Sequence, residues 1–351
     1  MSAPHPSASL AAPTPPEVDL AHEFLNRRTP MTTVRAILHR YPAVSPAIVL
    51  VVSVIVFGLI NGRFLAPTNL SLITQQVAVI GALGIAETLV ILTAGIDLSV
   101  GSAMVLSSIV IGNAATGMGM PGPVALLVGL AVGLATGVLN GLLVTRLNLP
   151  PFIVTLGTLS IFTALTLLVS SGATVQGDAM PSILTWTGLT VSVLGVDITY
   201  GVLITLLLYV VVSFALARTA WGRHVYAAGD DKEAARLTGI RVSGVLLSVY
   251  LVAGAIVGIT AWIQIGRDFG ASPNAATDAN LSVITAVVIG GTSLFGGRGN
   301  VWGTLLGALI VGVFRNGLAL AGLDVLYQTL AVGILVIVAV SIDQWIRKVR
   351  K

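Results

Sequence analysis

The chain has 351 residues, of which 55% are hydrophobic and only 9% are charged, whereas soluble globular proteins carry about 25% charged residues. This apolar excess excludes a soluble globular protein, and its long continuous runs argue against a membrane β-barrel, so the composition predicts an all-α polytopic membrane protein. The net charge of +4 does not indicate nucleic-acid binding, because the basic residues lie at the ends of apolar runs. The absence of cysteine excludes a disulfide framework.

Residues 1–42 are rich in Pro, Ala and Ser, a composition typical of a disordered segment. No apolar stretch follows a basic start, so the segment is not typical of a signal peptide. Residues 31–41 have the composition of a short basic interfacial helix. The sequence therefore predicts a disordered cytoplasmic N-terminus over 1–42 and a transmembrane domain over 43–351.

The apolar runs predict about ten transmembrane helices. They cover residues 45–62, 72–93, 99–116, 122–145, 152–171, 199–217, 244–266, 280–293, 300–321 and 325–346. Of the 18 Lys and Arg residues, only Arg63 and Arg267 fall in loops on the side opposite the termini, and only Arg315 falls within a span. The positive-inside rule therefore predicts cytoplasmic N- and C-termini.

The fourth and ninth predicted spans carry similar strings. Residues 137–142 read Gly-Val-Leu-Asn-Gly-Leu, and residues 312–318 read Gly-Val-Phe-Arg-Asn-Gly-Leu. Spans offset by five run in opposite directions, so the similarity predicts an inverted repeat of five plus five helices. The fourth span also has a glycine at every fourth position, which favours close helix packing. These glycines are Gly129, Gly133, Gly137 and Gly141.

A polar interruption with Gly95, Asp97, Ser99 and Gly101 joins the second and third predicted spans. Irregular backbone at membrane depth occurs where protein or a water-filled cavity surrounds it. We expect Asp97 to accept hydrogen bonds from Ser99 and the following amides, and so to cap the third span. The alternative interpretation is a gate or a contact with a soluble partner.

Residues 218–243 form a densely charged, Ala-rich segment between two apolar runs. Two aspartates stand where they cap a helix, and the residues after them favour its continuation up to Gly239. This pattern indicates a helix that docks on a soluble partner, and the alternative is an ordinary solvated loop helix. The predicted docking residues are Gly229, Asp230, Asp231, Glu233, Ala234, Ala235, Arg236 and Gly239.

Four long strings stand in order along the chain. They are LTAGIDLSVGS at 92–102, LPPFIVTLG at 149–157, TAWGRHVYAAGDDKEAA at 219–235 and AVVIGGTSLFGGRG at 286–299. Together they resemble the motifs of the ribose/xylose/fructose branch of ABC sugar-importer permeases, over about residues 45–348. Four long motifs in order are far more specific than one short pattern. Residues 219–226 and 342–348 look most similar to the fructose-type permeases.

The resemblance implies a homodimer in the bacterial inner membrane that works by alternating access. Such permeases bind two cytoplasmic ATP-binding subunits and receive a monosaccharide from a periplasmic or surface-tethered binding protein. The resemblance implies that residues 229–239 are the coupling helix that docks in a groove of the ATPase. The implied cargo is fructose or a ribose-like sugar.

The chain lacks the residues for ATP hydrolysis and for metal chemistry. A phosphate-binding P-loop requires Gly-Lys before Ser or Thr, and none of Lys232, Lys348 and Lys351 follows a glycine. The four histidines have no metal-ligand spacing. We therefore expect no enzymatic activity, metal or cofactor on this chain, with ATP and Mg²⁺ bound by the partner ATPase.

Polar residues inside the predicted spans are candidates for the sugar path, because such groups are costly in lipid. They are Gln75, Gln76, Glu87, Asn140, Thr155 and Asn316. Three interpretations of Glu87 stay open: it is protonated, pairs with Arg315, or lines a wet cavity. Asn140 and Asn316 favour hydrogen bonds between helices over substrate contact. Members of the resembled branch often carry Glu where this chain has Asn280.

Two other functions stay open at this point. One is a proton-coupled secondary transporter that uses Glu87 or Asp97 as its proton site. The other is a membrane scaffold that binds a partner through residues 218–243 without moving a solute.

Overall fold

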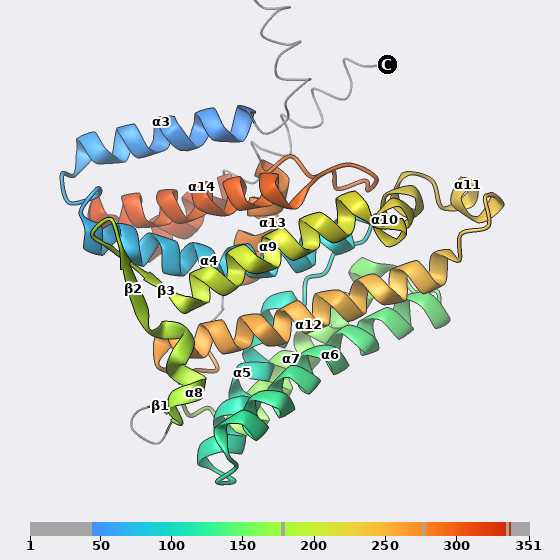
Figure 1. Cartoon of the computed structure of the whole chain (residues 1–351), viewed down its shortest axis with the longest axis horizontal. Coiled ribbons are helices and arrows are strands. Elements are labelled where there is room, and N and C mark those ends of the chain that lie inside the picture. The colour runs from blue at the N-terminus through green and yellow to red at the C-terminus, as the bar shows by residue number, and fades with distance from the viewer. Residues whose placement is uncertain (1–43, 177–179, 276–277, 335–336, 338–351) are drawn as a thin grey trace, which may run out of the picture. The chain divides into compact units, whose positions relative to one another are not determined.

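The structure is a computed structural model that describes residues 44–176, 180–275, 278–334 and 337 (Figure 1). Within these residues the chain is built almost entirely from helices. The predicted N-terminal segment 1–42 and the last part of the tenth predicted span lie outside the described residues.

Six of the described helices are long and apolar enough to cross a membrane. They are α4 (Pro67–Leu92), α6 (Gly122–Arg146), α7 (Pro151–Ser170), α9 (Tyr200–Arg218), α12 (Val242–Asp268) and α14 (Val301–Leu320). Four shorter apolar helices are α3 (Val44–Ile60), α5 (Val100–Thr116), α13 (Ala279–Ile289) and Val325–Ile334. Each predicted span coincides with one of these helices, so the polytopic all-α fold is confirmed. α13 is shorter than predicted because the chain turns at Gly291, where φ is +86°.

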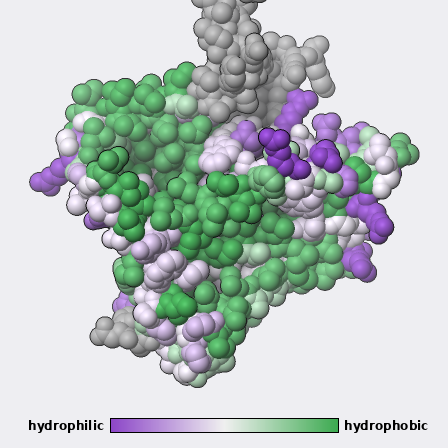
Figure 2. All heavy atoms as spheres, viewed as in Figure 1, coloured by the Kyte–Doolittle hydropathy of each residue, from purple (hydrophilic) through white to green (hydrophobic). Residues whose placement is uncertain are grey.

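The long helices differ in how much of their surface the bundle covers. In α4, 89% of the most apolar stretch is buried, and this helix contacts α9, α12, α13 and α14. In α7 and α9 only 28% is buried, and large apolar side chains such as Leu168 and Phe214 are exposed. Figure 2 shows hydrophobic side chains over α9 and α12, with hydrophilic ones gathered at the end where α10 (Ala220–Asp230) and α11 (Lys232–Leu237) lie. Apolar outer faces are what helices in contact with lipid require.

The helices pair as an inverted repeat predicts. α6 packs along α12 and α14 packs along α4, so the fourth helix of each half contacts the second helix of the other half. The third helices, α5 and α13, each begin after non-helical backbone. Their N-termini meet, since Gly101 N donates a hydrogen bond to Asn280 Oδ1 at 2.8 Å. Interrupted helices of this kind are found in many inverted-repeat transporters.

The glycine face of α6 makes the close helix contact that the sequence predicts. A Cβ atom on Gly133 would lie 2.7 Å from Gly258 Cα, and one on Gly137 would lie 2.3 Å from Tyr250 O. Real Cβ atoms do not approach backbone this closely, so α6 and α12 can only meet with glycine at these positions.

The sequence did not predict the small elements that connect α7 to α9. They are α8 (Ser182–Thr185), the 3₁₀ helix η1 (Trp186–Gly188) and the hairpin of β2 (Thr190–Val193) and β3 (Val196–Thr199). In addition, β1 (Val175–Gln176) pairs antiparallel with β4 (Gly270–Ala271). These elements lie at the start of α9 and the end of α12, whereas α10 and α11 connect the opposite ends of the same two helices.

Candidate functional site

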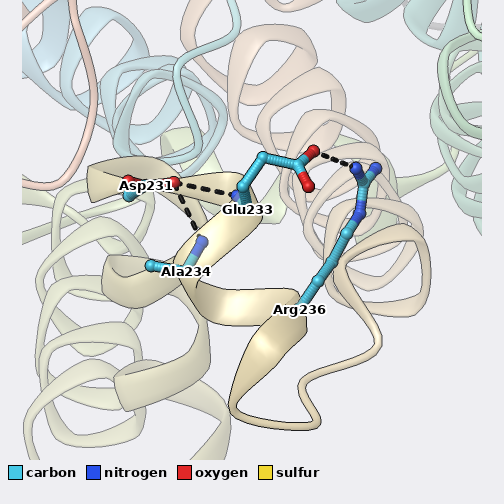
Figure 3. Close-up of polar contacts among 4 residues, drawn as sticks. All are labelled: Asp231, Glu233, Ala234 and Arg236. Atoms are coloured by element: carbon cyan, nitrogen blue, oxygen red, sulfur yellow. Dashed lines mark hydrogen bonds and ion pairs between the residues drawn. The ribbon is translucent and has the colours of Figure 1, made fainter.

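The charged segment 218–243 forms the two short helices α10 and α11. α11 begins after Asp231, whose Oδ1 accepts hydrogen bonds from Glu233 N at 2.9 Å and Ala234 N at 3.0 Å (Figure 3). Asp231 therefore caps a helix as predicted. The same prediction for Asp230 is wrong, because this residue is the last of α10 and precedes the cap.

α11 exposes an ion pair and an apolar side chain. Glu233 and Arg236 pair across one turn at 2.5 Å, with 77% and 58% of their side chains exposed (Figure 3). Leu237 is 89% exposed, while Ala235 is buried against the rest of the chain. Gly239, with φ +87°, ends the helix as predicted. An exposed ion pair contributes about 0.5 kcal/mol to stability, so this face adds little to the fold and is free to contact a partner.

α10 lies against the end of α4 and the glycine-rich loop that follows α13. A Cβ atom on Gly229 would lie 1.7 Å from Leu92 O, and the same oxygen accepts a hydrogen bond from Gly297 N at 3.0 Å. Tyr226 Oη donates to Gly299 O at 2.8 Å. Burial raises the pKa of Tyr226 above its ordinary value, which keeps the hydroxyl proton available for this bond. Three of the four strings identified in the sequence therefore meet at one place.

α10 is also fixed to α12. Trp221 Nε1 donates a hydrogen bond to Ser248 Oγ of α12 at 2.8 Å, while Thr219 Oγ1 caps the start of α10 itself by accepting one from Gly222 N at 3.2 Å. A displacement of α10 would therefore reach α4, α12 and the loop between α13 and α14 together.

The turn between α4 and α5 holds a second group of predicted residues, all of them buried. Asp97 Oδ1 accepts hydrogen bonds from Ser99 N at 2.8 Å and Ser99 Oγ at 2.6 Å. Asn140 Nδ2 donates to Ser99 Oγ at 2.9 Å, and Asp97 N donates to Glu87 Oε1 at 3.2 Å. Asp97 thus bonds Ser99 as predicted, but its predicted bonds to the following amides are wrong, because Gly101 N donates to α13 instead.

The predicted sugar-path residues do not converge on one site. Gln76 and Asn316 line a cavity of about 360 Å³, together with Gln264, Asp278 and Arg315. Arg315 NH2 lies 3.1 Å from Asp278 Oδ2, so the alternative in which Arg315 pairs with Glu87 is wrong. The guanidinium group is held by the carboxylate that precedes α13.

The other path candidates have local partners. Gln75 Nε2 donates to Ser71 Oγ at 3.1 Å, and Thr155 Oγ1 donates to the backbone oxygen of Ile96 at 2.9 Å. Asn316 exchanges hydrogen bonds with Asn69 at 2.8 and 2.9 Å, which is the predicted bond between helices.

Sequence reasoning missed Tyr226, Tyr250 and Asp278. Tyr226 stands in the charged segment 218–243 and Tyr250 in an apolar run. In both settings an aromatic residue indicates packing, and its hydroxyl group gives no separate signal. Asp278 lies in a predicted loop, where a carboxylate is ordinary. Among the described residues, no group of three or more His, Cys, Asp or Glu side chains could hold a metal ion.

A family model described as "Branched-chain amino acid transport system / permease component" matches residues 69–340. The chain is 48% identical to the fructose import permease protein FrcC of Rhizobium meliloti over 94% of this chain and 93% of that protein. It is 38% identical to the ribose import permease protein RbsC of Bacillus subtilis over 85% and 92% of the two chains. A solved chain described as a metal-chelate type ABC transporter in an inward-facing conformation matches 86% of this chain and 99% of its own, with TM-score 0.51 and 15% identity, which shows a shared fold.

Proposed function

This chain belongs to the family described as "Branched-chain amino acid transport system / permease component", and we propose that it is the transmembrane permease of an ATP-driven monosaccharide importer. Two of its relatives are named as import permeases for fructose and ribose. The 48% identity to the fructose permease extends over nearly the whole chain, which favours fructose as the cargo. The chain breaks no bond itself, and ATP and Mg²⁺ belong to a separate ATPase.

The contact of α10 with Leu92 O is the observation that carries this proposal. An element that transmits ATPase movements needs one exposed face for the partner and one rigid face toward the bundle. α11 supplies the exposed face through Glu233, Arg236 and Leu237. α10 supplies the rigid face through Gly229 and Tyr226. We assign α10 and α11 as the coupling element, which receives the movement of the ATPase dimer and passes it to α4.

The assembly is a homodimer in the bacterial inner membrane. The exposed apolar faces of α7 and α9 support burial against lipid and a second copy of the chain. The Lys and Arg distribution favours cytoplasmic N- and C-termini. With that orientation, α10 and α11 face the cytoplasmic ATP-binding subunits. The hairpin β2–β3 then lies on the opposite side, where a periplasmic or surface-tethered sugar-binding protein delivers the cargo.

The sugar passes through the cavity of about 360 Å³ that Gln76 and Asn316 line. Its volume lies within the roughly 300–1,000 Å³ typical of small-molecule sites. Gln76, Gln264 and the Asp278–Arg315 pair offer planar donors and acceptors of the kind that bind sugar hydroxyl groups. The buried turn at Gly95, Asp97, Ser99 and Gly101 lies outside this cavity and acts as a structural hinge beside the coupling element.

The test is sugar uptake by proteoliposomes that contain the chain, its cognate ATPase and its binding protein. We expect uptake to require ATP inside the vesicles and to stop when the ATPase is left out. Uptake that continues without any ATPase and collapses with a proton ionophore would identify a proton-coupled transporter instead. A chain that binds the ATPase but moves no solute under either condition would be a scaffold.

A further inference from the structure

Three buried polar atoms without a hydrogen-bond partner among the described residues lie around one small cavity. They are Glu87 Oε2, Asn140 Oδ1 and Tyr250 Oη. The described part of the chain has two other such atoms, on Ser107 and Thr292, and neither residue lines this cavity. Buried polar groups are almost always hydrogen-bonded, so the convergence of three around one space indicates a bound species.

The size of the cavity limits what can bind. Its volume is about 10 Å³, which is the room that one water-sized species needs. The side chains around it are almost fully enclosed, with Glu87 0%, Tyr250 1% and Asn140 2% exposed. A species that binds there therefore loses its contact with bulk water and depends on the protein for all its ligands.

The charge around the cavity is unbalanced. Two carboxylates, of Glu87 and Asp97, line it, and no basic residue does. Neither carboxylate takes part in an ion pair with the described residues. A buried carboxylate without a compensating charge costs many kcal/mol, so the cluster requires a positive charge or a proton.

The two carboxylates differ in how well the protein compensates them. Asp97 accepts two hydrogen bonds from Ser99 and a longer one of 3.4 Å from Asn140 Nδ2, and it precedes the N-terminus of α5, which also favours a negative charge. Glu87 accepts only the 3.2 Å bond from Asp97 N, and its Oε2 accepts none from the described residues. The carboxylate of Glu87 is therefore the group whose negative charge lacks compensation, and one positive charge beside it would balance the cluster.

We propose that this cavity binds one small monovalent cation, Na⁺, through Glu87 Oε2, Asn140 Oδ1 and Tyr250 Oη. Hard cations prefer oxygen ligands of these kinds. The side-chain amide of Asn140 fits this role, because Nδ2 donates to Ser99 and Asp97 while Oδ1 is buried and has no hydrogen-bond partner among the described residues. A water molecule would satisfy the three atoms but would need a separate proton on the cluster to balance the charge, whereas one cation supplies both the contacts and the charge.

The ion joins elements that lie far apart in the sequence. Glu87 belongs to α4, Asn140 to α6 and Tyr250 to α12. α4 ends at Leu92, whose backbone oxygen contacts α10. Na⁺ therefore holds the C-terminal end of α4 to the packed pair of helices α6 and α12. The site stands on the geometry of this chain alone and does not depend on the proposed transport function.

Thermal unfolding of the purified full chain in detergent tests the site. Measurements in NaCl, KCl and choline chloride at equal ionic strength separate Na⁺ binding from general salt effects. We expect Tm to rise with Na⁺ concentration, as mass action requires for a ligand that binds the folded state, and not to rise with choline. Glu87→Gln keeps the size of the side chain and removes its charge, so it should weaken the apparent Na⁺ affinity by more than about tenfold. Asp197→Asn, which changes an exposed carboxylate on β3, is the matched control and should keep the full response.

Three results overturn the proposal. They are an equal Tm in Na⁺ and choline, a Na⁺ response that survives Glu87→Gln, and a Tm that depends on pH but not on the cation, which assigns the positive charge to a proton. If Glu87→Gln does not fold, Tyr250→Phe removes one ligand and takes its place. Equilibrium dialysis with radioactive Na⁺ gives an independent reading: one ion per wild-type chain supports the site, and no bound ion overturns it.

Discussion

Gly229 lies so close to Leu92 that any side chain at position 229 would collide with the backbone oxygen of Leu92. A Cβ atom there would stand 1.7 Å from that oxygen and 2.8 Å from Gly297 N. Leu92 is the last residue of α4, the most enclosed of the long helices. The contact joins two backbones directly, without a flexible side chain between them. A small movement of α10 must therefore move α4, because packed backbone cannot absorb it.

The first prediction concerns this contact. Gly229→Ala should lower Tm and reduce ATP-driven uptake, because overpacking against backbone costs about 1–3 kcal/mol. Gly244→Ala is the matched control, since a Cβ atom at that position of α12 meets nothing nearer than 3.9 Å. Tm in detergent and uptake in proteoliposomes measure both effects. If the two variants have the same Tm and the same uptake, the close approach of Gly229 to Leu92 contributes neither to stability nor to transport.

The second prediction separates coupling from folding at α11. Glu233→Lys reverses one exposed charge, so it should leave the free energy of unfolding within about 0.5 kcal/mol of wild type while it reduces uptake and the co-purification of the ATPase. Leu237→Ala should act in the same direction, because the Leu237 side chain is 89% exposed and contributes little to the core of the described residues. Glu233→Gln is the control that loses the pair with Arg236 without reversing the charge. If Glu233→Lys retains full uptake and ATPase binding, α11 is a solvated loop helix and not the docking element.

The sequence predicts the parts of this fold that depend on local pattern. Long apolar runs give the position of each span, and Asp231 followed by Glu233 and Ala234 gives the start of α11. What it does not give is the choice of partner across the bundle. Arg315 bonds Asp278 rather than Glu87 because helix packing, and not spacing along the chain, decides which carboxylate lies within reach. The β2–β3 hairpin was missed for another reason: its strands are four residues each and partly apolar, so they look like the flanks of the following span.

The third prediction uses the hydrogen bond from Tyr226 to Gly299. Tyr226→Phe removes one hydrogen bond and should lower the free energy of unfolding by about 1 kcal/mol. It should also lower the amount of sugar taken up per ATP hydrolysed, because the bond joins α10 to the loop before α14. Because burial raises the pKa of Tyr226 in the folded state, its contribution is fully present below the ordinary tyrosine pKa of about 10 and is lost only as pH rises through the folded value. The difference in Tm between wild type and variant should therefore stay constant from about pH 6 to 9. A difference that shrinks within this range would contradict the assigned bond.

The fourth prediction compares two neighbouring glutamines of α4. Gln76 lines the 360 Å³ cavity and makes no hydrogen bond to the described residues, whereas Gln75 bonds Ser71 and lies outside the cavity. If the sugar passes this cavity, Gln76→Ala should raise the KM of uptake by about two- to tenfold, the range expected for the loss of one or two neutral hydrogen bonds to the cargo. Gln75→Ala should leave KM unchanged and lower Tm slightly, since it loses a bond within the protein. ATPase activity should stay at the wild-type level in both variants, because neither residue contacts α10. An equal KM for the two variants would place the sugar path elsewhere, whereas a rise in KM for Gln76→Ala alone would place this side of α4 on the route.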